Sequence, residues 1–437
     1  MTDVDTLIHA RWIIPIEPAG RVHRDHALAV RGGRIVDLLP SPEAEQRYRA
    51  SDTLHFPQHA LLPGFVNAHT HAAMSLFRGL ADDIPLMTWL NEHVWPAEAK
   101  WVTPEFVREG TELAVAEMLA SGTTCFNDMY FFAEDTARVC LSAGMRAVVG
   151  LIVLDFPTAY AQTADEYLHK GLAVHDGLRA AELVTTAFAP HAPYTVSDAP
   201  LQRLRTVNDE LNLPVHMHVH ETAHEVANAV EATGRRPLAR LAELGLIGPS
   251  LAAVHMTQLS AGEIGMLAGS GASVVHCPSS NLKLASGFCP VHALLTAGVN
   301  VAIGTDGAAS NNDLDMLEEL RLAALLAKGV AGEATAVPAH TALRMATLNG
   351  AKALGLDDRI GSLERGKQAD LVAIDLSHLP SEPVYDPASQ IVYTASRAQV
   401  SDVWVHGRRL LKNRQLTTLD ERAALQKARA WRDKIKP

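Results

Sequence analysis

Through the middle of the chain, from about residue 61 to 365, short apolar runs alternate with longer stretches of helical periodicity. Strands of a parallel sheet are buried on both faces and therefore have continuous apolar sequences, whereas the helices between them are amphipathic. Eight such runs occur, at residues 60–71, 123–129, 146–154, 183–193, 214–221, 251–258, 272–278 and 299–307. Eight parallel strands close a (β/α)8 TIM barrel of about 250 residues. We therefore predict an α/β fold whose barrel domain spans residues 61–365.

The two ends of the chain follow a different pattern, in which short alternating β segments are broken by turns. Residues 1–60 contain a Gly32-Gly33 turn between two alternating runs, and residues 369–377 and 400–411 repeat this style near the other end. We expect residues 1–60 and 366–437 to form one smaller, discontinuous β-sandwich domain, with the barrel inserted between its halves.

Most of the apolar runs end in a histidine or an aspartate. These residues are His69, His71, His191, His218, His255, His276 and Asp306. Active sites of barrel enzymes lie at the carboxyl ends of the strands. Any single histidine of this set could be a core residue, but structural histidines have no reason to prefer one end of the strands. The set therefore indicates a functional site at the barrel mouth.

The sequence His69-Thr70-His71 places two imidazoles on the same side of one strand, because side chains of a strand alternate with period two. Two nitrogen ligands suit a borderline cation such as Zn²⁺ or Fe²⁺. His218 and Asp306 can complete the site and leave a position open for water. His216 and His220 are alternatives to His218: His216 shares its face two residues deeper, and His220 is at or past the expected strand end. We favour His218.

Composition narrows the class of partner. The formal net charge of −11 argues against nucleic acid or an anionic membrane surface, so a small molecule is the expected substrate. We see no signal peptide and no apolar run of roughly 18–20 residues that could span a bilayer. The four cysteines form no Cys-x-x-Cys pair, which favours reduced thiols and a cytoplasmic protein. The motif of the small cytidine-type zinc deaminases is absent.

Several longer blocks resemble the amidohydrolase superfamily and, within it, the 5-methylthioadenosine/S-adenosylhomocysteine deaminase branch. They are PGFVNAHTHAAMSLFRGLADD (63–83), APHAPYTVS (189–197), HVHET (218–222), HCPSSNLKLASG (276–287), GTDGAASNND (304–313), MATLNGAKALG (345–355) and GSLERGKQADLVAID (361–375). The resemblance covers almost the whole chain. It implies a metal-dependent hydrolase that deaminates an adenine nucleoside.

The resemblance also implies roles for individual residues. One divalent metal per subunit, most commonly Zn²⁺ although Fe²⁺ or Mn²⁺ would also suit, is bound by His69, His71, His218 and Asp306. Asp306 takes the proton of the attacking water and passes it to the leaving amine, and Glu221 protonates the purine ring at N1. His255 donates or accepts a hydrogen bond at the attacking oxygen. The plainer interpretation of Glu221 is an acid stabilised at a helix N-terminus.

Three further residues match the family pattern of substrate contacts. The resemblance implies that Glu98 holds the ribose hydroxyls, that His191 contacts the ribose side and that Trp89 packs near the base. The alternatives are a solvated charge for Glu98 and loop packing for Trp89. His276 is interpreted as structural or as a supporting residue behind the metal ligands.

The stretch after the third predicted strand bears on the substrate. Family members that accept S-adenosylhomocysteine carry arginines there, but residues 150–157 contain no arginine and one acid. An apolar wall suits a methylthio group better than a charged tail. We therefore expect 5′-methylthioadenosine to be preferred, with S-adenosylhomocysteine and adenosine as weaker substrates.

Two alternatives stay open at this point. One is another aminohydrolase or chlorohydrolase of the same barrel, acting on guanine, 8-oxoguanine, cytosine or a triazine. The other is a catalytically silent scaffold barrel, which would need broken metal ligands that this sequence does not have. Because related barrels often associate, we also expect a homo-oligomer with a small-molecule nucleoside substrate and neither nucleic acid nor membrane as a partner.

Overall fold

The computed structural model describes residues 1–436 and places their strands in two sheets of eight. In one sheet, neighbouring strands are parallel and follow one another in chain order. These strands are β5 (Phe65–Thr70), β6 (Thr123–Asp128), β7 (Arg146–Val153), β8 (Val184–Pro190), β9 (Val215–Val219), β10 (Leu251–His255), β11 (Ser273–His276) and β12 (Asn300–Ile303). The predicted (β/α)8 barrel is confirmed.

The ends of the barrel sheet meet where β12 approaches β5. The backbone N–H of Asp306 donates to the carbonyl oxygen of His69 (3.0 Å), and the N–H of Thr305 donates to Oδ1 of Asn67 (3.0 Å). Gly304 is needed for this approach, because a Cβ atom at this position would lie 2.8 Å from the Cβ of His69. Closure therefore brings Asp306, just past the last strand, beside the histidines at the end of the first.

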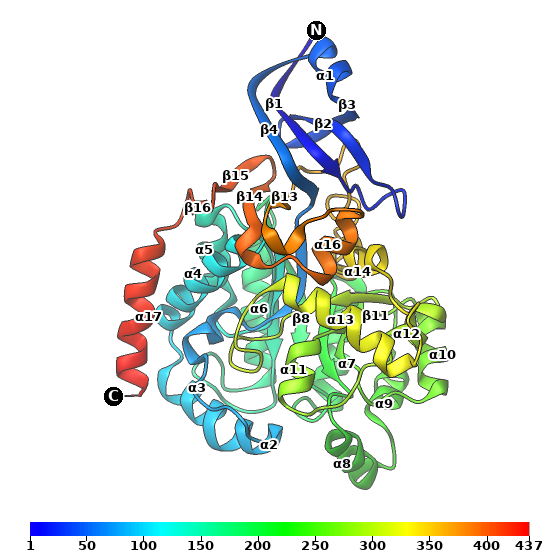
Figure 1. The fold of residues 1–437 in the computed structure, drawn as a ribbon. Coiled ribbons are helices and arrows are strands. Elements are labelled where there is room, and N and C mark those ends of the chain that lie inside the picture. The colour runs from blue at the N-terminus through cyan, green and yellow to red at the C-terminus, as the bar shows by residue number, and fades with distance from the viewer. Residues whose placement is uncertain (437) are drawn as a thin grey trace.

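Helices surround the barrel and connect its strands (Figure 1). They are α4 (Pro104–Ala120), α5 (Ala133–Ala143), α6 (Ala164–Leu178), α7 (Asp198–Leu211), α8 (Ala223–Thr233), α9 (Pro237–Glu243), α10 (Ala261–Ser270), α11 (Pro278–Lys283), α12 (Val291–Thr296), α13 (Met316–Ala331), α14 (Ala339–Met345) and α15 (Leu348–Ala353). Sequence signals set their ends: the Thr103 side chain accepts a hydrogen bond from the N–H of Phe106 at the start of α4. Among residues 1–436, no helix combines the length and apolar character needed to cross a membrane.

A long connection between β5 and α4 folds into short helical turns. They are η1 (Ala72–Phe77), α2 (Leu86–Thr88), the π-helical turn η2 (Trp89–Val94) and α3 (Trp95–Trp101). Residues 86–102 of this connection contribute one wall of the cavity at the barrel mouth, described below.

The second sheet takes strands from both ends of the chain, as the β patterns predicted. It contains β1 (Thr2–Ile13), β2 (His23–Arg31), β3 (Arg34–Pro40), β4 (Tyr48–Pro63), β13 (Leu371–Asp375), β14 (Val400–Val405), β15 (Arg408–Lys412) and β16 (Gln415–Leu416). Strand β4 joins the two halves, because it pairs in parallel with β1 and antiparallel with β13. The remaining elements are α1 (Ser41–Arg47), η3 (Leu379–Ser381), α16 (Pro387–Tyr393), η4 (Arg397–Gln399) and α17 (Glu421–Ile435), which lies along the side of the barrel (Figure 1).

A buried ion pair ties this second sheet to the barrel. Arg146, the first residue of β7, donates from Nε to Oδ2 of Asp370 (2.7 Å), and both side chains are 2% exposed. Asp370 directly precedes β13, and its other oxygen also accepts the N–H of His406 (2.7 Å). The β-rich domain is thus anchored at the amino ends of the barrel strands, which leaves their carboxyl ends free to form a site.

Candidate active site

Four side chains of types that can bind a metal converge at the carboxyl ends of the strands. His69 and His71 come from the end of β5, His218 from β9, and Asp306 from the turn after β12. Nε2 of His69 lies 3.2 Å from Nε2 of His218 and 3.1 Å from Oδ1 of Asp306. Nε2 of His71 lies 3.3 Å from the same oxygen. Ligand atoms around a tetrahedral cation, each at about 2.1 Å from it, lie roughly 3.4 Å apart, so these separations fit one metal ion.

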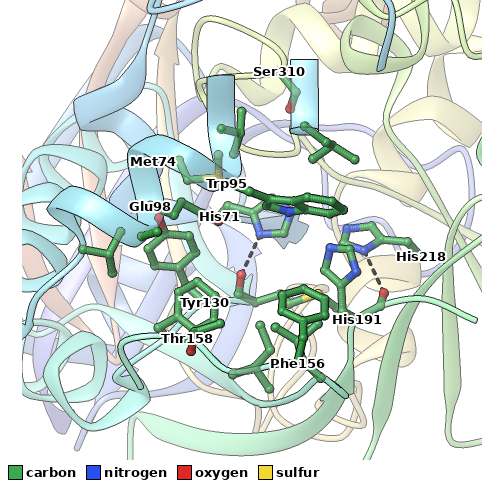
Figure 2. Close-up of a pocket in the computed structure, with 18 of the residues that line it drawn as sticks. His71, Met74, Trp95, Glu98, Tyr130, Phe156, Thr158, His191, His218 and Ser310 are labelled. Atoms are coloured by element: carbon green, nitrogen blue, oxygen red, sulfur yellow. Dashed lines mark hydrogen bonds between the residues drawn. The ribbon is translucent and has the colours of Figure 1, made fainter. Parts of the chain in front are cut away.

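The hydrogen bonds of the imidazoles show which nitrogens are free to bind a cation. Nδ1 of His71 lies 2.6 Å from the carbonyl oxygen of Met129, and Nδ1 of His218 lies 2.8 Å from that of His191 (dashed lines in Figure 2). Because a carbonyl oxygen only accepts, each imidazole donates from Nδ1 and keeps a lone pair on Nε2. These Nε2 lone pairs face one another and the Asp306 carboxylate, and no proton lies between them. Metal sites have this arrangement of donor atoms.

The electrostatics of the cluster agree with this assignment. Burial lowers the pKa of His69 to about 4 and that of His218 well below its ordinary value, so both imidazoles are neutral at neutral pH. Burial alone would raise the pKa of Asp306, but the His69 hydrogen bond and the surrounding imidazoles hold it well below its ordinary value. Neutral imidazoles and an ionised carboxylate are the forms that bind metal.

The two alternatives to His218 have other contacts. Nε2 of His216 lies 2.8 Å from Nδ1 of His69, so His216 supports a ligand from behind. Nε2 of His220 accepts the backbone N–H of Leu238 (3.1 Å) at the start of α9. Neither has a ring nitrogen in the His69, His71 and His218 cluster, whose ligand atoms all lie within 4.8 Å of one another.

Glu221 and His255 lie beside this cluster and are both buried. Oε2 of Glu221 is 3.9 Å from Nε2 of His255. The backbone of Glu221 is held by Glu225, whose carboxylate accepts the N–H groups of His220 (3.1 Å) and Glu221 (2.7 Å). Burial raises the pKa of Glu221 above its ordinary value. A ligand atom of His255 also groups with those of His69 and Asp306 within 4.8 Å, so the two residues share one site with the metal donors.

Two of these residues have a strained backbone. His255 has φ +74° and Asp306 has φ +65°, in the left-handed region that L-residues other than glycine rarely adopt. Such conformations cost about 1–3 kcal/mol and persist where the surrounding contacts hold them, which is common at functional sites. The chain thus leaves β10 and β12 by sharp turns that keep both side chains at the barrel mouth.

A cavity of about 500 Å³ opens from the metal donors toward the short helices after β5. Trp95 and Phe156 lie in it with ring centroids 5.8 Å apart (Figure 2). Glu98 and Tyr130 lie together toward one end of the view, and His191 and His218 lie toward the other. Among residues 1–436, no lysine or arginine lines this cavity. It is therefore an apolar pocket with acidic groups and imidazoles at defined points, as small-molecule sites commonly are.

The residues predicted to contact substrate all line this cavity, in different ways. Glu98 belongs to α3, and burial raises its pKa to about 7. His191 follows β8, and its Nδ1 lies 3.0 Å from Oγ1 of Thr195. Trp89 is 6% exposed, and its indole N–H donates to the carbonyl oxygen of Ala81 (3.1 Å), so it is packed into the wall. His276, predicted to be structural, is buried and does not line the cavity.

The sequence reasoning missed several residues of the site. Trp95 lines the cavity, and two residues of α11 contact the central side chains. Ser280 donates to Oδ2 of Asp306 (2.6 Å), and Oδ1 of Asn281 lies 2.9 Å from Nδ1 of His255. The block HCPSSNLKLASG contained the signal, because polar residues directly after a barrel strand lie at the mouth.

An eight-stranded parallel barrel that gathers three imidazoles and a carboxylate at the carboxyl ends of its strands defines a class, the barrel hydrolases that work with a divalent metal. A model of the amidohydrolase family matches residues 60–410. The chain belongs to this family, and it is a hydrolase of the deaminase type, so the resemblance seen in the sequence motifs is confirmed.

Individual relatives are similar over the full length. The 5-methylthioadenosine/S-adenosylhomocysteine deaminase of Teredinibacter turnerae is 53% identical over 434 residues, which are 99% of this chain and 98% of that protein. The protein of the same name from Saccharophagus degradans is 50% identical over 434 residues, 99% of this chain and 97% of that protein. A crystal structure of an adenosine deaminase from Xanthomonas campestris with bound zinc is 56% identical, has a TM-score of 0.99, and matches 100% of this chain and 99% of that chain.

Proposed function

We propose that this enzyme deaminates 5′-methylthioadenosine to 5′-methylthioinosine and ammonia, with S-adenosylhomocysteine and adenosine as weaker substrates. The proposal rests on the residues that line one cavity. Metal donors and Glu221 lie at one end, Glu98 lies at the other, and an apolar wall without lysine or arginine among residues 1–436 lies between them. The relatives named above, which share about half of its residues, support the same activity.

His69, His71, His218 and Asp306 would hold one divalent metal, and we propose Zn²⁺. The zinc in the similar adenosine deaminase structure supports this choice. When bound, such a cation supplies Lewis-acid activation of water, whose pKa it can lower from about 15.7 toward about 7. The sequence-based expectations of a homo-oligomer and a cytoplasmic location stay predictions.

The protein's own groups would move the protons. Water adds to C6 of the purine as Asp306 takes its proton, and Glu221 protonates N1. The C6–N bond then breaks as Asp306 passes the proton to the amine, which leaves as ammonia. The remaining proton of the added oxygen returns to Glu221 as the C6 carbonyl forms. His255 lies 3.9 Å from Glu221 and beside Asp306, where it can hydrogen-bond the oxygen that adds to C6.

Substrate contacts would follow the length of the cavity. Glu98 lines the cavity beside Tyr130, so its carboxylate would be placed to accept the ribose hydroxyls. His191 would contact the ribose side, and Trp89 would form part of the wall near the base rather than offer its N–H, which Ala81 already accepts.

The wall after β7 supports the preference for a methylthio group. Leu154 and Phe156 line the cavity, whereas the single acid of this stretch, Asp155, is exposed and accepts the backbone N–H of Ser197 (2.6 Å). A carboxylate in this part of the cavity would find no cation to pair with, and an unpaired buried charge costs several kcal/mol.

We expect ammonia release from 5′-methylthioadenosine with a kcat/KM at least about tenfold above that for S-adenosylhomocysteine, since 1.4 kcal/mol already corresponds to a factor of ten. The measurement is a screen of both thioethers, adenosine, guanine, 8-oxoguanine, cytosine and a triazine with the metal-loaded enzyme. Equal kcat/KM values for the two thioethers would overturn the preference, and activity on free bases alone would overturn the nucleoside assignment.

Replacing Glu98 with alanine separates a nucleoside enzyme from one that acts on a free base. If Glu98 accepts hydrogen bonds from the ribose, the Glu98→Ala variant should lose about 10–100-fold in kcat/KM on 5′-methylthioadenosine, because hydrogen bonds to a charged group contribute about 1.5–3 kcal/mol. Glu105→Ala, at an exposed position on α4, is the control and should match the wild type. A Glu98→Ala variant with unchanged kcat/KM would show that no ribose is held there.

A further inference from the structure

Helix α11 contacts two side chains that come from different strands. The hydroxyl of Ser280 donates to Oδ2 of Asp306 (2.6 Å), after β12, and Oδ1 of Asn281 lies 2.9 Å from Nδ1 of His255, at the end of β10. Ser280 is 0% exposed and Asn281 is 2% exposed, so water does not compete for these bonds. One turn of helix thus reaches both groups that would act on the attacking water.

We propose that α11 is a positioning element of the active site, in which Ser280 holds Asp306 and Asn281 holds His255 in their working orientations. The proposal deepens the proposed function, because it concerns the same two groups. Ser280 and Asn281 are positioning residues, since they touch the acting side chains and not the substrate.

The chemistry of each contact fits its task. Oδ1 of Asp306 faces the imidazoles of His69 and His71, so Oδ2 is the oxygen that remains for proton transfer. A hydroxyl can donate to this oxygen when it is ionised and accept from it when it is protonated, so Ser280 can orient Asp306 in both states. The Asn281 oxygen accepts from Nδ1 of His255 and leaves Nε2 directed toward Glu221.

The backbone gives an independent reason for such support. His255 and Asp306 are the residues with φ +74° and +65° at these strand ends, and strained conformations persist only where neighbouring contacts hold them. Asp306 accepts a hydrogen bond from Ser280 of α11, and His255 donates one to Asn281 of the same helix.

Helix α11 is itself anchored from behind by Glu319 of α13, which is fully buried. One oxygen of Glu319 accepts the backbone N–H of Ser279 (3.1 Å), and the other accepts from Nδ2 of Asn311 (2.7 Å). Asn311 also donates to the carbonyl oxygen of Thr305, the residue before Asp306 (2.8 Å). The same carboxylate therefore sets the distance between α11 and the segment that carries Asp306.

The test compares neighbouring positions on α11. Removing support behind metal-site residues typically costs about 10–100-fold in activity, so Ser280→Ala should lower kcat by about that factor while KM changes less than about threefold. Ser279→Ala is the matched control, because the Ser279 hydroxyl is buried but has no hydrogen-bond partner within residues 1–436. Its kcat should stay within about twofold of the wild type.

Asn281 allows a conservative rescue. Asn281→Leu removes the acceptor for His255 and should lower kcat as Ser280→Ala does, whereas Asn281→Asp keeps an oxygen at nearly the same place. The Asn281 amide nitrogen has no partner within residues 1–436, so the aspartate loses no hydrogen bond there. It should retain at least about tenfold more activity than the leucine variant.

Metal content and thermal unfolding midpoint are measured for every variant, and kcat is expressed per bound metal. Equal losses in Ser280→Ala and Ser279→Ala, or no advantage of aspartate over leucine at position 281, would overturn the proposal. The proposal would also be overturned if the Ser280 and Asn281 variants lost their metal while kcat per bound metal stayed unchanged. The assay uses the nucleoside that the wild type turns over fastest. A wrong substrate assignment therefore appears in the wild type, and a wrong role for α11 appears only among the variants.

Discussion

Replacing Glu221 with glutamine is expected to lower kcat by about 10²–10⁴-fold, the range that general acid–base catalysis contributes. Glutamine has the same shape but no proton to transfer at neutral pH. Glu221 is 6% exposed, burial raises its pKa, and its backbone N–H is held by the Glu225 carboxylate (2.7 Å). It is therefore a buried carboxyl group at the site, and burial favours its protonated form relative to an exposed glutamate.

The measurement is kcat and KM on 5′-methylthioadenosine at constant metal content. Glu231→Gln is the control, because Glu231 lies on α8, the helix that follows Glu221, and is exposed. KM should change little in Glu221→Gln, since the substitution removes a proton transfer in the transition state and keeps the binding surface. A variant that retains wild-type kcat would exclude Glu221 as the proton donor.

Replacing His218 with glutamine is expected to release the metal and to lower activity by at least about 10³-fold, since the activation of water depends on the cation. His220→Gln is the informative comparison. Both histidines are buried, His218 within β9 and His220 directly after it. Nε2 of His220 accepts the Leu238 N–H, whereas Nε2 of His218 lies 3.2 Å from Nε2 of His69.

Metal content per chain, measured on folded and gel-filtered protein, distinguishes the two positions. His220→Gln should keep its metal even if its unfolding midpoint falls, because the lost contact supports α9. A His218→Gln variant that retains a full complement of metal would show that His218 is not a ligand. Metal loss in His220→Gln alone would transfer the role to His220.

Local pattern was enough to predict the barrel and the region of its site. Runs of apolar residues at 60–71 and 299–307 end in His69, His71 and Asp306, and the end of a parallel strand is the mouth of a barrel whatever the helices outside it do. The same rule led to His191 and His255, both of which lie at the mouth in the structure.

The wall of the cavity was harder to predict. The helical phase of the connection after β5 is broken by the π-helical turn η2, in which each turn holds an extra residue. Trp89 consequently packs into the wall with its N–H on Ala81, and Trp95, six positions later, lies in the cavity against Phe156. A periodicity argument that assumes regular helix cannot choose between the two tryptophans.

What the sequence determined by itself is the eight-stranded barrel, the β-rich domain from both chain ends, and a metal-type cluster of histidines and one aspartate at the strand ends. These follow from alternation and strand position, which are properties of neighbouring residues. Only the tertiary structure decided that His218 lies at Nε2 of His69 while His216 lies behind it at Nδ1, and that α11 contacts Asp306 and His255. Those contacts join side chains from separate strands, and their geometry depends on barrel closure and backbone turns that no local pattern contains.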